Sequence, residues 1–267
     1  MTVAVLNSLM SRQSRNCARG SGMSEDSHDY YIRYRNEIMD QFEKMVLVAA
    51  EVGQNHLSEE ALSNLIRRSR EELEALLPSL PYLGGKKSLS WALMLQSAQT
   101  LAFYKACKSV GMEVREFAQL MYEVGEAYYD SLSGMKKRVF RWMASSGLVK
   151  RGWKRWAAET QRRQYPGDWV GEFVEGDGKS FDWGLNLVEC GWLKLIGEHH
   201  AEEAAPYACL GDFVRMRALG VGFMRTQTRA CGHPMCDFRF VRGYQTPRGW
   251  PPENLEEFKT RSQAKQD

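Results

Sequence analysis

The feature that most constrains the fold is a change in the spacing of apolar residues partway along the chain. From Ser27 to Leu132 they recur every three or four positions, as they do along one side of an α-helix. From Trp169 onward they alternate with polar residues, which is typical of strands with one buried face. Helices followed by strands and a few more helices favour the α+β class. We expect a helical N-terminal layer followed by a small antiparallel sheet with helices on one face.

Glycine and proline divide the first part into four expected helices, at 27–52, 58–78, 88–110 and 113–132. Ser58 is predicted to be an N-cap, because a serine hydroxyl accepts the first free N–H groups of a helix. The connections are short. The sequence therefore predicts a bundle-like helical layer.

The most basic stretch, 135–163, holds ten lysines and arginines with a single acidic residue, Glu159, and three interleaved tryptophans. One interpretation is a solvated helix pair whose aromatic side packs on the core. The other is a peripheral membrane contact through 135–163, since basic amphipathic helices with tryptophan suit an anionic surface. Nucleic acid fits less well, because the net charge of +3 is mild and no binding motif is present.

In the second part, segments 169–175 and 181–189 alternate like strands and are joined by a glycine-rich turn at 176–179. A helix is expected at 192–199, and a longer one from Pro206 to Gly220. A second hairpin is expected from strands at 221–228 and 235–241.

The long helix and the second hairpin carry the polar residues of interest. Cys209 and Asp212 share a helix face with apolar neighbours, so Asp212 should have a cationic partner, a hydrogen-bond donor or an elevated pKa. Arg225 is expected to face inward from the first strand. Cys236 and Asp237 are adjacent on the second strand and should point to opposite faces.

These residues carry a resemblance to a known family. The patterns are Cys209-x-x-Asp212-Phe213, Arg225-Thr226-x-Thr228, Cys236-Asp237-Phe238-x-Phe240 and, upstream, Glu189-Cys190-Gly191. Over roughly Trp169–Gly243 the chain resembles the L-2-amino-thiazoline-4-carboxylic acid hydrolase family. The resemblance implies a hydrolase that opens a cyclic isothiourea, by cleaving a carbon–nitrogen or carbon–sulfur bond, to an N-carbamoyl or S-carbamoyl cysteine.

Such a reaction needs a nucleophile, a proton donor and a group that holds the substrate carboxylate. Cys209 and Cys236 are alternative nucleophiles, with water as a third, and Asp212 is the candidate acid or base, with Asp237 as a further polar member. Arg225 is the candidate carboxylate anchor. Its alternative role is a structural ion pair with Asp212 or Asp237. Thr226 and Thr228 are candidate hydrogen-bond donors to the substrate.

A second hypothesis comes from a different class of function. Cys190, Cys209 and Cys236 could converge as thiolates and bind a small molecule or zinc. The enzyme hypothesis instead predicts a small-molecule substrate, no cofactor and no metal ligands. No nucleotide-binding fingerprint is present.

Composition indicates in which cellular compartment the protein lies and how the chain divides into regions. There is no run of about 18 apolar residues, so no transmembrane segment is expected. The six cysteines favour a reducing compartment, the cytoplasm, with the mitochondrion as the alternative. We divide the chain into a disordered or transit-like N-terminus (1–26), a helical region (27–164), an α+β hydrolase-like core (165–245) and a C-terminal tail (246–267).

Overall fold

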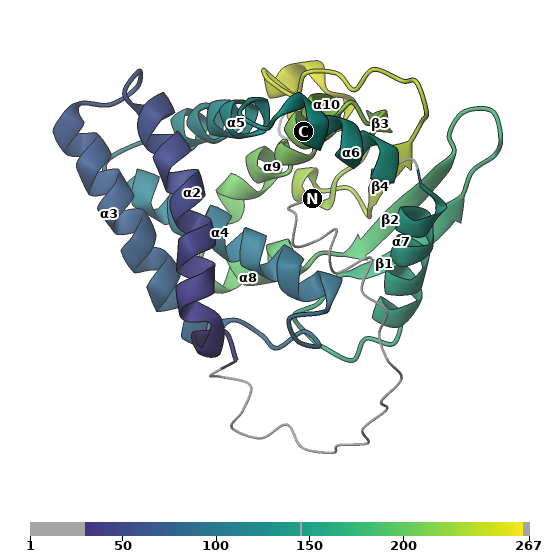
Figure 1. Cartoon of the computed structure of the whole chain (residues 1–267), viewed down its shortest axis with the longest axis horizontal. Helices are drawn as coiled ribbons and strands as arrows, with labels where there is room; N and C mark the ends of the chain where they lie inside the picture. The colour runs from purple at the N-terminus through teal and green to yellow at the C-terminus, as the bar shows by residue number, and fades with distance from the viewer. Residues whose placement is uncertain (1–29, 145, 264–267) are drawn as a thin grey trace.

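The computed structural model describes residues 30–144 and 146–263, and side chains up to residue 259 (Figure 1). The expected disordered or transit-like segment at 1–26 lies outside these residues. Within them, no helix is both long and apolar enough to cross a membrane.

The chain forms a helical layer followed by a four-stranded antiparallel sheet, which confirms the α+β prediction (Figure 1). The strands are β1 (Val170–Glu175), β2 (Trp183–Glu189), β3 (Phe223–Met224) and β4 (Cys236–Phe240), in the order β1-β2-β4-β3. Leu187 lies opposite Cys236 in the sheet, which places the start of β4 beside the end of β2.

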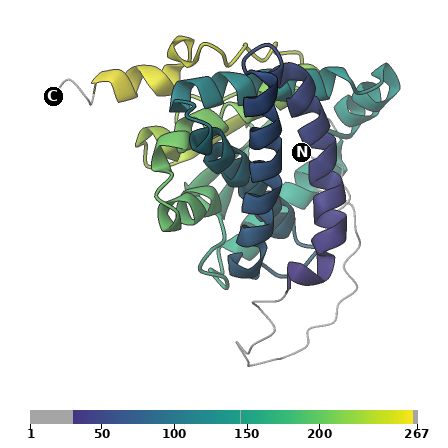
Figure 2. The same ribbon diagram turned by 90° about the vertical axis from the view of Figure 1, so that its left-hand side faces the viewer.

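The four expected helices are α2 (Arg35–Gly53), α3 (Glu59–Leu76), α4 (Leu89–Ser109) and α5 (Val114–Asp130). Ser58 caps α3, as predicted, by accepting a hydrogen bond from the backbone N–H of Ala61. Buried residues lie on most sides of α4, which packs against α3, α5 and α8 (Gly191–Glu198). Figure 2 shows α2 and α3 running side by side at the edge of the layer.

The basic stretch forms α6 (Gly134–Ala144) and α7 (Gly147–Thr160), and the two helices differ. Trp156 of α7 is buried against the sheet, where it approaches Gly171 of β1, so the core-packing interpretation holds for α7. None of the described residues of α6 is buried, and Trp142 is 70% exposed.

The first expected hairpin is present as β1 and β2. Its turn is held by Asp177, whose Oδ1 accepts hydrogen bonds from the backbone N–H groups of Lys179 and Ser180. The helix expected at 192–199 corresponds to α8.

The second expected hairpin is much shorter than predicted. β3 has only two residues, and the chain then leaves the sheet and forms the 3-10 turn η5 (Arg229–Cys231). The loop after β3 is held by Asp237, whose carboxylate accepts the backbone N–H groups of Thr226 and Gln227 at 2.9 and 2.7 Å. A side chain thus accepts two backbone N–H groups here, while the Gln227 carbonyl accepts the backbone N–H of Asp237 at 3.2 Å.

The prediction of a single helix from Pro206 to Gly220 is also wrong. The chain forms α9 (Ala205–Ala208) and α10 (Gly211–Leu219), with Cys209 and Leu210 in the turn between them. Tighter i to i−3 hydrogen bonds, such as Leu210 N–H to the Tyr207 carbonyl at 3.0 Å, interrupt the regular α-helical pattern. The predicted end is confirmed, because Gly220 adopts the left-handed conformation with φ of 65°.

The last described segment packs back onto the second hairpin. It contains the 3-10 turn η6 (Pro252–Asn254) and α11 (Glu256–Gln263). Leu255 and Phe258 are buried in one apolar cluster with Phe213 of α10 and Phe223 of β3. The remaining elements are the 3-10 turns η2 (Ile32–Tyr34), η3 (Leu77–Ser79) and η4 (Glu202–Ala204).

Candidate functional site

Four side chains from α10, the residue after β3 and α11 form a chain of ion pairs, here called the ion chain: Arg215, Asp212, Arg225 and Glu257. All are buried except Asp212, whose side chain is partly exposed. Asp212 binds Arg215 and also Nη1 of Arg225, the latter at 2.8 Å. Arg225 binds Glu257 through two hydrogen bonds, Nε to Oε2 at 2.6 Å and Nη2 to Oε1 at 2.8 Å. Asp212 therefore has the cationic partners that its apolar helix face predicted.

The guanidinium of Arg225 donates its hydrogen bonds to acceptors within the protein. Its Nη2 also donates to the Cys209 carbonyl at 3.0 Å, and the group lies over the Phe213 ring. Burial alone would lower the pKa of Arg225, but Glu257 and Asp212 hold it well above its usual value. The alternative prediction, an ion pair with Asp212, is confirmed. A substrate carboxylate would have to compete with these partners, so Arg225 is poorly placed as the predicted anchor.

Three thiols lie beside the ion chain and interact electrostatically with one another. Cys190 precedes α8, Cys209 is in the turn between α9 and α10, and Cys236 begins β4. Burial raises the pKa of all three, that of Cys190 to about 12 and that of Cys209 well above its usual value. Each is therefore a protonated thiol at neutral pH.

Cys236 has the most polar surroundings of the three. The backbone N–H of Arg229 donates to its Sγ at 3.3 Å, and the hydroxyl of the fully buried Thr228 lies 3.5 Å from the same atom. The charge of Arg225 and these two hydrogen bonds oppose the effect of burial on the pKa of Cys236. These groups would stabilise a thiolate at this position.

Arg229 was not singled out in the sequence, although it lies next to the thiols. Its Nη1 donates to the Pro234 carbonyl at 2.7 Å, while its buried Nε has no hydrogen-bond partner among the described residues. Its charge acts to lower the pKa of Cys190. The alternation pattern could not have found it, because the chain has left the sheet at this point.

Asp237 and Thr226 form a separate arrangement. Asp237 points away from the Cys236 side, as the strand alternation predicted, and its Oδ2 accepts the hydroxyl of the exposed Thr226 at 2.6 Å. With the two backbone N–H groups described above, Asp237 thus fixes the loop that follows β3. The structure brings Cys209, Asp212, Arg225, Thr228 and Cys236 together and leaves Asp237 and Thr226 outside this group.

The zinc hypothesis has no supporting arrangement. Among the residues that the structure describes, no group of three or more His, Cys, Asp and Glu side chains is placed to hold a metal ion. Cys190, Cys209 and Cys236 are near one another without forming a ligand set.

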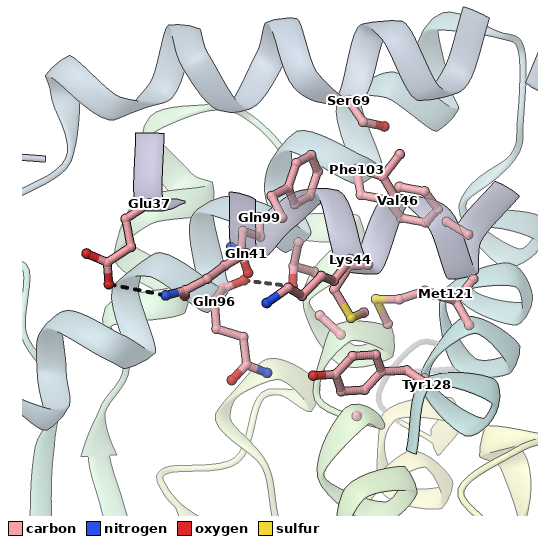
Figure 3. A pocket seen from close by; sticks show the side chains of 18 of the residues that line it. Glu37, Gln41, Lys44, Val46, Ser69, Gln96, Gln99, Phe103, Met121 and Tyr128 are labelled. Atoms are coloured by element: carbon pink, nitrogen blue, oxygen red, sulfur yellow. Dashed lines mark hydrogen bonds between the residues drawn. The ribbon is translucent and has the colours of Figure 1, made fainter. Parts of the chain in front are cut away.

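A large cavity, partly open to solvent, lies on another side of α9 and α10. It has a volume of about 1110 Å³ and is lined mainly by α2, α3, α4 and α5 (Figure 3). Ala208, Gly211 and Val214 contribute to its wall, and these residues alternate with Cys209 and Asp212 along the chain. None of the seven predicted site residues lines it.

Comparison with known proteins identifies the family. The model of the L-2-amino-thiazoline-4-carboxylic acid hydrolase family matches residues 95–240, more than half of the chain. Searches of curated proteins and of solved structures found no match. The match begins in α4, well upstream of Trp169, so the helical layer takes part in the family pattern more than the sequence motifs indicated. It includes all seven predicted site residues. The chain therefore belongs to the L-2-amino-thiazoline-4-carboxylic acid hydrolase family.

Proposed function

We propose that this member of a hydrolase family opens the ring of a small cyclic amidine amino acid, such as 2-amino-thiazoline-4-carboxylate. The observation that carries the proposal is the convergence of Cys209 and Cys236 with Arg225 and Asp212 inside the matched segment. A pair of thiols beside a buried guanidinium suits nucleophilic attack on an electron-poor carbon.

The reaction consumes one water molecule, which hydrolyses one bond of the ring and opens it. The reacting atom is the amidine carbon, which is bonded to the ring nitrogen and the ring sulfur. Cleavage of the carbon–nitrogen bond yields an S-carbamoyl cysteine, and cleavage of the carbon–sulfur bond yields an N-carbamoyl cysteine. Both outcomes are consistent with the family name.

Cys236 is our candidate nucleophile, in preference to Cys209 or water. Its thiol adds to the amidine carbon, its proton passes to the ring nitrogen, and one ring bond breaks. Water then adds to the same carbon and releases the thiol. The Arg229 N–H and the Thr228 hydroxyl support this choice, because they stabilise negative charge on Sγ. Asp212 keeps Arg225 beside the thiols and thereby acts as a positioning residue.

Arg229 is our candidate anchor for the substrate carboxylate. Unlike Arg225, it has a buried Nε–H that no described residue accepts, and it borders both Cys190 and Cys236. A guanidinium binds a carboxylate through two parallel hydrogen bonds, and Arg229 has donors left for this geometry.

A panel of thiazolines, cyclic amidines and carbamoyl amino acids tests the proposal. We expect ring opening of a carboxylated cyclic amidine, with kcat reduced by about 10³-fold or more in Cys236→Ser. Cys231→Ser is the matched control, since Cys231 is half-buried in the turn that precedes β4 and this substitution should leave kcat unchanged. Full activity of Cys236→Ser would exclude the covalent route.

The role of Arg229 as carboxylate anchor is tested separately, by comparing KM and kcat for substrates with and without a carboxylate. Arg229→Met should raise KM for carboxylated substrates more than it lowers kcat, and should not change KM for an analogue without the carboxylate. Arg229→Lys should restore part of the affinity. An equal effect on both substrates would contradict the anchor.

We also propose that α6 contacts anionic membrane surfaces, because it carries an exposed apolar stripe. Met135 (77% exposed), Val139 and Trp142 (70% exposed) recur at i, i+4 and i+7 on this helix, and basic residues flank them. Apolar residues embedded among cations match the interfacial zone of an anionic bilayer.

A further inference from the structure

The cavity of the helical layer is far larger than the proposed substrate requires. Its volume of about 1110 Å³ is slightly above the range of roughly 300–1,000 Å³ usual for sites that bind drug-sized molecules. An amino-acid-sized heterocycle would fill only a small part of it. Since none of the predicted site residues lines the cavity, it requires an explanation independent of the hydrolase proposal.

The two ends of the cavity differ in polarity. Figure 3 shows Glu37, Gln41 and Gln96 toward one end, and the apolar side chains of Phe103, Val46 and Met121 toward the other. Further apolar residues complete the wall, among them Phe42, Met45, Leu65, Ile66, Val124 and Val214. A ligand that satisfies both ends has a polar head and an apolar tail.

The charges in the wall specify the sign of the head. Three lysines, Lys44, Lys86 and Lys87, line the cavity together with a single acid, Glu37, which binds Lys86. The ion pair between Glu37 and Lys86 balances these two charges. Lys44 has no acidic partner among the described residues. An anionic head complements this arrangement, and a cationic one would be repelled.

We propose that this cavity binds an amphipathic monocarboxylic acid, with its carboxylate toward Lys44 and its apolar tail between α2 and α5. α5 and α10 lie within the segment matched by the family, whereas α2 and α3 lie before residue 95 and outside it. About a third of the lining residues therefore come from two helices that lie before the matched segment.

Gly211 provides a direct test. It lines the cavity at the start of α10, and a Cβ placed there would meet nothing within 4 Å, so a larger side chain can enter the cavity without a backbone clash. Gly134, at the start of α6, also has open space around its Cβ position and does not line the cavity. Gly134→Phe is therefore the matched control for Gly211→Phe.

The experiment uses the full chain and the fluorescent probe 11-(dansylamino)undecanoic acid, which is then displaced by dodecanoic acid, dodecanol or dodecylamine. We expect saturable binding of the probe at one site, with the acid the best competitor and the amine the poorest. Gly211→Phe should raise the Kd of dodecanoic acid about tenfold or more, while Gly134→Phe leaves it unchanged. Lys44→Met should raise this Kd about 2–5-fold and leave that of dodecanol unchanged.

Three results would overturn the proposal: no saturable binding to the wild-type protein, equal Kd values in Gly211→Phe and Gly134→Phe, or displacement by the amine as strong as by the acid. Far-ultraviolet circular dichroism of each variant verifies folding, and Lys44→Met tests the head group even if Gly211→Phe does not fold. Because the readout is binding, failure of this proposal leaves the hydrolase proposal untouched.

Discussion

Arg225 and Glu257 are 32 residues apart in the chain and form a two-bond ion pair whose side chains are 1% and 0% exposed. The pair ties the last described helix, α11, to the loop that carries the candidate site. Because Arg225 also binds Asp212 and the Cys209 carbonyl, its position depends on Glu257.

Removal of Glu257 should therefore be costly. Glu257→Ala leaves a buried guanidinium with one of its two acidic partners, and we expect the free energy of unfolding to fall by about 3–5 kcal/mol. Urea unfolding followed by circular dichroism measures this. Glu253→Ala is the control, because the Glu253–Arg115 pair is exposed and should contribute less than about 1 kcal/mol. Similar losses in the two variants would contradict the structural role of the buried pair.

The thiols should be slow to alkylate at neutral pH. Burial raises the pKa of Cys190, Cys209 and Cys236, so little thiolate is present in the resting protein. With iodoacetamide at pH 7.5, mass spectrometry should show these three residues labelled more slowly than the same residues in urea-unfolded protein. Rapid labelling of Cys236 in the folded protein would show that its neighbours outweigh burial.

Stability should fall in alkaline solution partly because of Cys190. Burial raises its pKa from about 9 to about 12, so the folded protein holds this proton more tightly than the unfolded chain does. The contribution is fully present below about pH 9 and is lost as the pH rises toward 12. Between those values, Cys190→Ala should reduce the slope of unfolding free energy against pH by about 1.4 kcal/mol per unit. Unfolding at pH 7.5 to 10.5 checks this; parallel curves would refute it.

Asp237 should support the loop after β3 rather than transfer protons. Asp237→Ala removes the acceptor of three hydrogen bonds, and we expect it to destabilise the fold by about 1–3 kcal/mol. Asp237→Asn keeps one carbonyl acceptor for the two backbone N–H groups and should lose less. If Asp237→Asn folds like the wild type but lacks hydrolase activity, the predicted catalytic role stands.

The α6 face should bind anionic vesicles. Trp142→Ala should reduce cosedimentation with vesicles containing phosphatidylserine, and neither protein should bind neutral vesicles at moderate salt. The control is Leu47→Ala on α2, because Leu47 is 64% exposed on a different helix. Equal binding by the two variants would argue against a contact through α6.

Much of the fold could be predicted because local rules act on neighbouring residues. Apolar spacing located α2 to α5, Ser58 marked the start of α3, and Gly220 marked the end of α10. The same rules failed where a side chain takes part in the backbone hydrogen bonding. After Met224 the carboxylate of Asp237 accepts two backbone N–H groups, and alternation alone could not show that a side chain would form these hydrogen bonds.

The sequence by itself determined the order of helices and strands, the family motifs and the need of Asp212 for a cation, since each depends on residue type and local spacing. Only the tertiary structure decided that Glu257 would fill the remaining side of Arg225 and that Arg229 would lie beside Cys236 with a donor to spare. Ion pairs and cavities join segments far apart in the chain. Which side chains meet in them depends on how the helices and strands pack, and the local sequence pattern does not contain this information.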